Sequence, residues 1–171
     1  MAKYITEVLK ELNENVKLFE TEYKKSGNGG PLGVLFKHAY EPENRFLLPE
    51  GEPPFKPSSE PIGMTPVPFI SQIQKFKNFV RQDISNTKRE MVFVQMLESI
   101  HPDEAKILLA VKDQKLHELY PKLTHEVIMK AGFIRELSKE EIPVKKSKRT
   151  PRKKKDLLLE THQDTENPKE P

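Results

Sequence analysis

The pattern of apolar and polar residues along this chain is that of several amphipathic helices. Apolar residues recur at steps of three and four over 4–23, which is the period of one face of an α-helix. The glycine-rich stretch 26–30 ends this pattern, so we expect one helix over 4–23. A shorter helix is expected to begin at Pro31, because proline fits the first turn of a helix. The apolar positions of the two stretches are Ile5, Val8, Leu9, Leu12, Val16, Phe19 and Tyr23, then Leu32, Leu35, Phe36 and Ala39.

Helical periodicity returns after a proline-rich interval, over 69–80 and again over 88–100. Ser85, Asn86 and Thr87 precede the second of these stretches, and their side chains are of the kind that cap helix N-termini. The helix over 88–100 has apolar residues on more than one side, which favours a central position in the fold. These residues are Met91, Val92, Phe93, Val94, Met96, Leu97 and Ile100.

The stretch ESIHPDEAKILLAVKDQKL combines core-type residues with a cluster of titratable side chains. His101, Asp103, Glu104 and Asp113 are candidate metal ligands or acid–base groups, but His101 and Asp103 lack the i,i+4 spacing that sets two ligands on one helix face. Pro102 followed by two acids is also the start signal of a helix, because carboxylates are stabilised near a helix N-terminus. We therefore interpret the cluster as a helix start, and we expect Leu108 to be buried in the core.

A proline-rich segment separates the second and third helical stretches. Eight prolines fall within the 27 residues of 42–68, too many for a regular element that needs backbone N–H donors. The segment also carries large apolar residues, which a purely solvated linker seldom does. We expect it to lie extended across the helices. Phe46 and Phe55 are candidate contacts with a protein partner, since proline-rich chain loses little entropy on binding; the alternative is that both rings fill the core.

The segment LTHEVIMKAGFI predicts a helix capped by Thr124 and ended by Gly132. It is similar to the first helix and turn of helix-turn-helix DNA-binding domains. A recognition helix should then present Arg, Lys, Asn or Gln to the major groove. The following residues instead include Glu136, Glu140 and Glu141, whose charge would repel phosphates. We favour a packed helix with a glycine cap.

These stretches together predict an all-α fold, a compact bundle of about six short helices with the proline-rich loop 42–68 packed on it. The apolar period fades beyond 141, apart from DLLLE at 156–160. We therefore expect a helical domain over 1–141 and a disordered tail over 142–171, basic and then acidic. The chain has no cysteine, which excludes disulfides, thiolate zinc sites and cysteine nucleophiles. No apolar run approaches the ~20 residues of a membrane span, and the N-terminus lacks a signal-peptide pattern, so we expect a soluble, unprocessed protein.

The net charge of +3 is unevenly distributed. Residues 1–142 contain 20 Lys and Arg against 21 Asp and Glu, whereas 143–171 contain 9 against 5. Eight of these positive charges lie within 145–155 with no acid among them, a density that predicts weak, salt-sensitive and sequence-independent binding to nucleic acid. No aromatic residue lies among them, so base stacking is not expected; a solubilising tail without a partner is the alternative. The candidate nucleic-acid-binding residues are Lys145, Lys146, Lys148, Arg149, Arg152, Lys153, Lys154 and Lys155.

No pattern in the chain requires catalysis. Gly27, Gly29, Gly30 and Gly33 suggest a phosphate-binding loop, but the dinucleotide motif follows a strand, and these glycines follow a predicted helix. The histidines are scattered, and no serine stands near one at the spacing of a catalytic triad. We expect a non-enzymatic protein with no cofactor, no metal and no small-molecule substrate.

Three segments carry a resemblance to a known family: HAYEPENRFLLPEGEPPFKP, TKREMVFVQMLESIHPDEAKILLAVKDQKL and YPKLTHEVIMKAGF. They resemble a small, poorly characterised domain family of T4-like bacteriophages and marine cyanophages. Its pattern has an LLPEG.PPYKP loop, a KRE..F..LLE.(V/I).P.(D/E)A.LLLA.KDKKL helical pair and a closing LT...V..AFP helix. The resemblance covers 32–133, departs from the pattern at 117–121 and does not reach the basic tail. It carries no catalytic residue over to this chain, and it implies a virus-encoded auxiliary protein of the host cytoplasm.

The sequence thus predicts a non-enzymatic, phage-encoded auxiliary binding protein whose basic tail gives weak affinity for nucleic acid. The alternative is a protein–protein adaptor or regulator, for example of host transcription or lysis timing. Such an adaptor would dock a phage or host protein through the helical body and the proline-rich loop, and its tail would be only solubilising.

Overall fold

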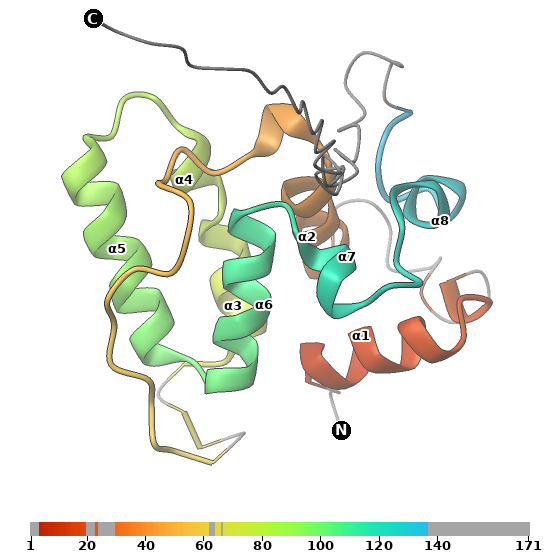
Figure 1. The fold of residues 1–171 in the computed structure, drawn as a ribbon, viewed down its shortest axis with the longest axis horizontal. Coiled ribbons are helices and arrows are strands. Elements are labelled where there is room, and N and C mark those ends of the chain that lie inside the picture. The colour runs from red at the N-terminus through yellow and green to blue at the C-terminus, as the bar shows by residue number, and fades with distance from the viewer. Residues whose placement is uncertain (1–3, 20–22, 24–29, 62–63, 66, 137–171) are drawn as a thin grey trace, which may run out of the picture.

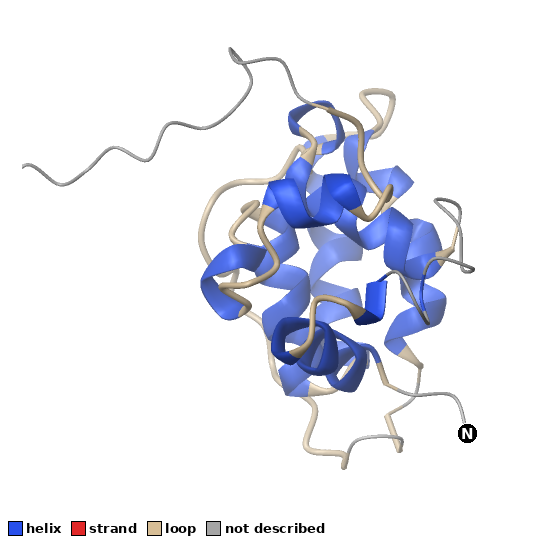
Figure 2. Ribbon diagram, turned by 90° about the vertical axis from the view of Figure 1, so that its right-hand side faces the viewer, coloured by secondary structure: helices blue, strands red, loops and turns tan. Residues whose placement is uncertain are grey.

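The computed structural model describes residues 4–19, 23, 30–61, 64–65 and 67–136 of the chain. Within these residues the regular structure is entirely helical, and Figures 1 and 2 show helices and connecting loops without a strand. The predicted all-α fold is therefore confirmed. The predicted disordered tail, and the domain end near 141, lie outside the described residues. The helices are α1 (Ile5–Glu14), α2 (Pro31–Tyr40), η3 (Pro42–Asn44), α3 (Phe69–Gln72), η4 (Ile73–Lys75), α4 (Lys77–Val80), α5 (Asn86–Ser99), α6 (Pro102–Lys112), α7 (Leu116–Leu119) and α8 (His125–Lys130).

The first helix is shorter than its apolar pattern predicts. α1 buries Ile5, Val8, Leu9 and Leu12 but ends at Glu14, so the expectation of one helix over 4–23 is wrong. The backbone of Asn15 is extended, and its side-chain oxygen accepts a hydrogen bond from the Lys17 N–H at 3.2 Å. Asparagine side chains compete with helical hydrogen bonds in this way. Phe19 is nevertheless buried, because residues 18 and 19 are helical again and its ring packs against those of Phe36 and Phe133.

The stretch 69–80 forms three short pieces, α3, η4 and α4, where the pattern predicted one helix. The fully buried positions explain the irregularity: Ile73, Phe76 and Phe79 follow one another at steps of three. Residues at i and i+3 align on one side of a 3₁₀-helix, whereas in an α-helix they drift around the axis. The tighter turn thus keeps all three side chains in the core.

α6 is the central helix of the bundle, where it packs against α1, α2, α5 and α7. Leu108 has no exposed surface, so its predicted burial is confirmed. The expectation that the helix over 88–100 is central is wrong, because Figure 1 shows α5 at one side of the molecule. One face of α5 is buried through Phe93, Met96 and Leu97, while Met91 is 54% exposed.

Two groups of aromatic rings form much of the core. In the first, the Phe19 ring lies 5.8 Å from that of Phe36 and 5.5 Å from that of Phe133. This contact joins the segment after α1 to α2 and to the chain after α8. The second group is larger and joins the proline-rich segment to α2, to α4 with the residue before it, and to α5. Its rings are those of His38, Phe46, Phe76, Phe79 and Phe93, with neighbouring centroids 5.0 to 6.3 Å apart.

The last helix begins and ends as the sequence predicts. The Thr124 hydroxyl accepts a hydrogen bond from the Val127 N–H at 3.4 Å, and Gly132 follows α8 with a φ of 80°. Residues 133–136 are not helical, and Phe133 and Ile134 are buried. The described part of the chain after α8 thus packs onto the body, and the remainder of the segment in which a recognition helix was considered lies outside the described residues.

Candidate functional site

The two aromatic residues that the sequence predicts as partner contacts differ in burial. Phe46 is 2% exposed and is packed among the second group of rings, so its side chain is not accessible to a partner in this conformation. Phe55 is half-buried and packs on the edge of the core, so part of its ring faces outward. The candidate nucleic-acid-binding residues within 145–155 lie outside the described residues.

The proline-rich segment is tied to α5 by a buried arginine. Arg89 is 3% exposed, and its guanidinium donates to the carbonyl oxygens of Leu47, Arg81 and Ile84 at 2.6 to 3.0 Å. It also donates to the Asn86 side chain at 2.8 Å. The hydrogen bonds replace much of the hydration that a buried cation loses. Arg89 therefore joins three stretches of chain at the start of α5.

A second buried cation holds the next part of the segment from the end of α6. Lys112 is 2% exposed; its ammonium donates to the Pro49 carbonyl at 2.8 Å and pairs with the Asp113 carboxylate. Asp113 in turn accepts a long hydrogen bond, 3.4 Å, from the Gly51 N–H. Gly51 has a φ of 89°, a conformation that glycine adopts without steric cost. The turn in the segment is thus fixed by its backbone.

A third attachment lies near the other end of α5, where the Lys56 N–H donates to the Glu98 carboxylate at 3.1 Å. The segment consequently runs from the first turn of α5, past the end of α6, to the last turns of α5. Figure 1 shows it crossing the same side of the molecule as α5. Beyond this attachment lies a shallow hollow of about 290 Å³, lined by Lys56, Pro57, Ser58, Ser59, Glu60 and Glu98.

Each of these attachments uses backbone groups of the segment, which leaves several of its side chains outward, while Leu48 and Phe55 pack partly against the core. Leu47 is 43% exposed, and Glu50, Glu52 and Lys56 are exposed as well. We call the exposed side of residues 47–60, together with Glu98, the loop surface. It offers apolar, acidic and basic side chains on a backbone that is held in one conformation.

Arg89, Lys112 and Glu98 were missed as positioning residues by reasoning from sequence. Periodicity assigns charged residues to the solvent face of a helix, and a cation buried among carbonyl oxygens breaks that rule. The available signal was helical position: Arg89 lies one turn before Phe93 on α5, and Lys112 lies one turn after Leu108 on α6, so each cation shares the buried face of its helix. Nothing comparable marks Glu98.

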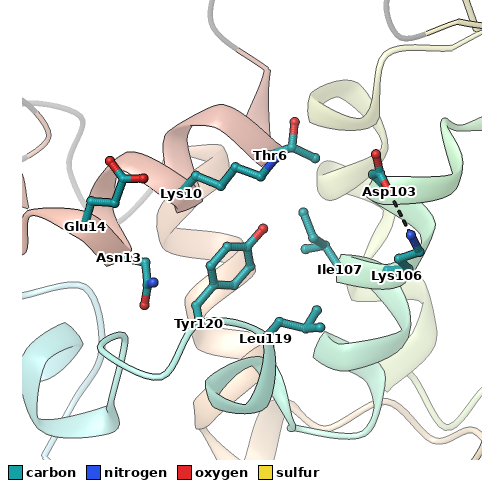
Figure 3. Close-up of a pocket in the computed structure, with 9 residues that line it drawn as sticks. All are labelled: Thr6, Lys10, Asn13, Glu14, Asp103, Lys106, Ile107, Leu119 and Tyr120. Carbon is teal, nitrogen blue, oxygen red and sulfur yellow. Dashed lines mark hydrogen bonds and ion pairs between the residues drawn. The ribbon is translucent and has the colours of Figure 1, made fainter.

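A separate groove of about 330 Å³ lies between α1, α6 and α7 (Figure 3). Leu119 supplies apolar surface, whereas Ile107 is 1% exposed; Lys10 and Lys106 supply positive charge. Asp103 and Lys106 form an ion pair at 2.8 Å across one turn of α6. The complete lining is Thr6, Lys10, Asn13, Glu14, Asp103, Lys106, Ile107, Leu119 and Tyr120.

The titratable cluster at the start of α6 is structural. His101 Nδ1 accepts a hydrogen bond from the Asp103 N–H at 3.2 Å, and Pro102 occupies the first turn, which confirms the predicted helix start. The hydrogen bond from Lys106 lowers the pKa of the Asp103 carboxyl. Glu104 turns inward, and burial raises the pKa of its carboxyl. Among the described residues no three His, Asp or Glu side chains are arranged to hold a metal ion.

The buried arginine gives a direct test of how the segment is held. Arg89→Met should lower the free energy of unfolding by about 2–4 kcal/mol, because each buried carbonyl left without a donor costs about 1–3 kcal/mol. Chemical denaturation measures the change. Arg81→Met is the matched control: the Arg81 side chain is exposed and pairs with Asp83, so this variant should unfold at nearly the wild-type midpoint. Equal midpoints for the two variants would contradict the assignment.

Comparison with known proteins adds a family but no activity. No curated protein matches the chain, and no solved structure matches it. Within the described residues no helix is both long and apolar enough to cross a lipid bilayer. A family model matches residues 7–118, a span that contains most of α1, the elements from α2 to α6, most of α7 and the whole loop surface. Because this match extends over more than half of the sequence, the chain belongs to a family of unknown function, DUF6433.

Proposed function

We propose that this protein is a non-enzymatic binding protein that docks a protein partner through the loop surface. The observation that carries the proposal is the mode of attachment. Arg89, Lys112 and Glu98 hold the segment through its carbonyl and N–H groups. Leu47 and part of Phe55 are thereby left for contacts with another molecule.

A loop that is already ordered binds at lower entropic cost. Immobilising a flexible side chain on association costs about 0.5–1.5 kcal/mol, and ordering a loop adds to that cost. In this protein the loop is ordered when the chain folds, because Arg89, Lys112 and Glu98 hold its backbone. Mixed apolar and charged side chains on such a frame suit a protein surface better than a small substrate, for which an enclosed pocket is usual.

A second activity, weak binding to nucleic acid, is favoured by one feature of the sequence. Eight positive charges fall within 145–155 without an acid among them. Neutralisation of phosphates by such a run releases counterions and gives affinity without sequence preference. We call residues 145–155 the basic run. The basic run and the loop surface would then bind different ligands.

The resemblance to a domain family of T4-like phages and cyanophages supports a setting for these activities. We propose that the protein is a phage-encoded auxiliary factor of the host cytoplasm. Its partner at the loop surface is then a phage or host protein. A role in host transcription or in the timing of lysis is compatible with this setting.

Site-specific photo-crosslinking in phage-infected host cells tests the docking proposal. A photo-crosslinking amino acid at Leu47, or at the exposed Glu52, should give a discrete covalent product with a second protein. The same amino acid at Lys130, an exposed residue of α8, is the matched control and should give none. The proposal fails if the two loop positions yield no product, or if all three positions yield the same one.

A further inference from the structure

The groove between α1, α6 and α7 has an apolar side that is not covered by the described chain. Leu119 is 46% exposed, although it belongs to a helix whose first residue, Leu116, is fully buried. In Figure 3 the side chain of Ile107 lies on the same side of the groove, but Ile107 is buried, so the accessible apolar surface there is that of Leu119. A ligand that fits this surface needs apolar side chains of its own.

The polar lining of the groove offers donors to an anion. Lys10 has no ion-pair partner among the described residues, and Lys106 is already paired with Asp103. The Tyr120 hydroxyl makes no hydrogen bond within the described part of the chain, and Figure 3 shows it directed between α1 and α6. An ammonium and a phenol O–H near an apolar wall together suit a carboxylate that is adjacent to aliphatic side chains.

The groove also contains acids, which restricts where such a carboxylate fits. Asp103 is turned toward Lys106 on α6 (Figure 3), so most of its charge is offset locally. Glu14 lies at the far end of α1, beside Asn13. Asp103 also interacts electrostatically with Lys10 and with Tyr120, so a ligand carboxylate fits beside Lys10 and Tyr120 on the side away from Asp103.

We propose that the segment Asp156–Glu160 of this same chain docks in the groove. Its sequence is DLLLE, and Leu157 to Leu159 form the one run of consecutive apolar residues within 137–171. An acid stands at each end of the run, so either end can supply a carboxylate to Lys10 and Tyr120. The leucines cover Leu119.

The length of the intervening chain permits this contact. Residues 137–155 separate the last described residue from Asp156, and 19 residues span about 60 Å when extended. A body of this size has a radius of gyration of about 14 Å, so the segment reaches any face. A tether of this length gives an effective concentration on the order of millimolar, at which even weak docking is populated.

Docking would change how the basic run is presented. The run within 145–155 would be attached to the body at both ends, by α8 on one side and by the DLLLE contact on the other. It would then form a closed basic loop next to the body. The inference is independent of docking at the loop surface, because the groove is formed by other elements.

Paramagnetic relaxation in the full-length chain tests the proposal. The chain has no cysteine, so Thr161→Cys accepts a single spin label next to the segment. Amide resonances of the groove, such as those of Lys10, Lys106 and Leu119, should be lost to broadening. Amide resonances at the start of α5, for example that of Lys88, should be retained.

Two variants with the same label control for non-specific contact. Replacing Leu157, Leu158 and Leu159 together with serine should restore the groove resonances, and so should Leu119→Ser, which changes an exposed residue and leaves the core intact. Broadening that persists in both variants, or that is spread evenly over the body, overturns the proposal. In a second sample, spin-labelled chains are mixed with isotopically enriched chains that carry no spin label. Equal broadening of the groove resonances in that mixture would assign the contact to a second copy and would also overturn the proposal.

Discussion

A chain that ends at Pro143 should lose nearly all salt-sensitive affinity for duplex DNA. The remaining body carries no net positive charge, since residues 1–142 contain 20 Lys and Arg against 21 Asp and Glu. For the full chain, the logarithm of affinity should fall with the logarithm of salt concentration. The slope should be roughly −3 to −6, because each neutralised phosphate contributes about −0.9 and geometry keeps some of the eight charges away from the DNA.

A chain that ends at Lys155 is the matched control, because it keeps the basic run and lacks only the acidic end. It should bind with the same slope as the full chain, measured by fluorescence anisotropy over a salt series. Single Lys→Ala changes within 145–155 should each weaken binding modestly and equally on different sequences, unlike the loss of a base-reading arginine. If the chain ending at Pro143 binds as tightly as the full chain, with sequence preference, then the helix-turn-helix interpretation of 124–142 replaces the proposed basic run.

Leu108→Ala should lower the free energy of unfolding by about 2–5 kcal/mol, the usual range for truncating a fully buried leucine. Leu108 has no exposed surface and lies on α6, the helix against which α1, α2, α5 and α7 pack. The cavity would therefore open at the centre of the bundle, where few neighbours are free to move into it. Denaturant titration followed by circular dichroism measures the loss.

Asp103→Ala on the same helix is the control for this prediction. It removes an exposed carboxylate from the first turn, which should cost about 0.5–1 kcal/mol through the helix dipole. A chelator should leave both unfolding curves unchanged. If a chelator destabilised the wild-type chain as much as Leu108→Ala does, the cluster at His101 would have to be a metal site.

Much of the helical architecture could be predicted from the sequence, because burial of one helix face leaves a periodic pattern. α2 and α6 begin at the expected prolines, and α5 and α8 begin and end close to the expected residues, with Ser85 and Thr124 as caps and Gly132 as terminator. The pattern failed where a local interaction overrides it. Asn15 ends α1 because its side chain accepts a hydrogen bond from the Lys17 N–H. The spacing of apolar residues does not reveal this competition with the helical hydrogen bonds.

The candidate sites were harder to predict because they depend on tertiary contacts. The groove exists only because α7 brings Leu119 and Tyr120 opposite α1. Phe46 and Phe55 carry the same kind of signal in the sequence, yet Phe46 lies in the core and Phe55 at its edge. Which of two aromatic residues in a proline-rich segment is buried depends on where the segment crosses the helices.

The attachment of residues 47–56 through their backbone has a consequence for engineering. Because Arg89, Lys112 and Glu98 recognise carbonyl and N–H groups, the outward side chains are not needed to keep the segment in place. Positions 47, 52 and 56 can therefore be randomised together in a display library, whereas Glu50 is kept because its carboxylate pairs with Arg45 of the same segment. Gly51 is also kept, because its φ of 89° excludes most other residues. The small helical body would then serve as a carrier for new binding specificities.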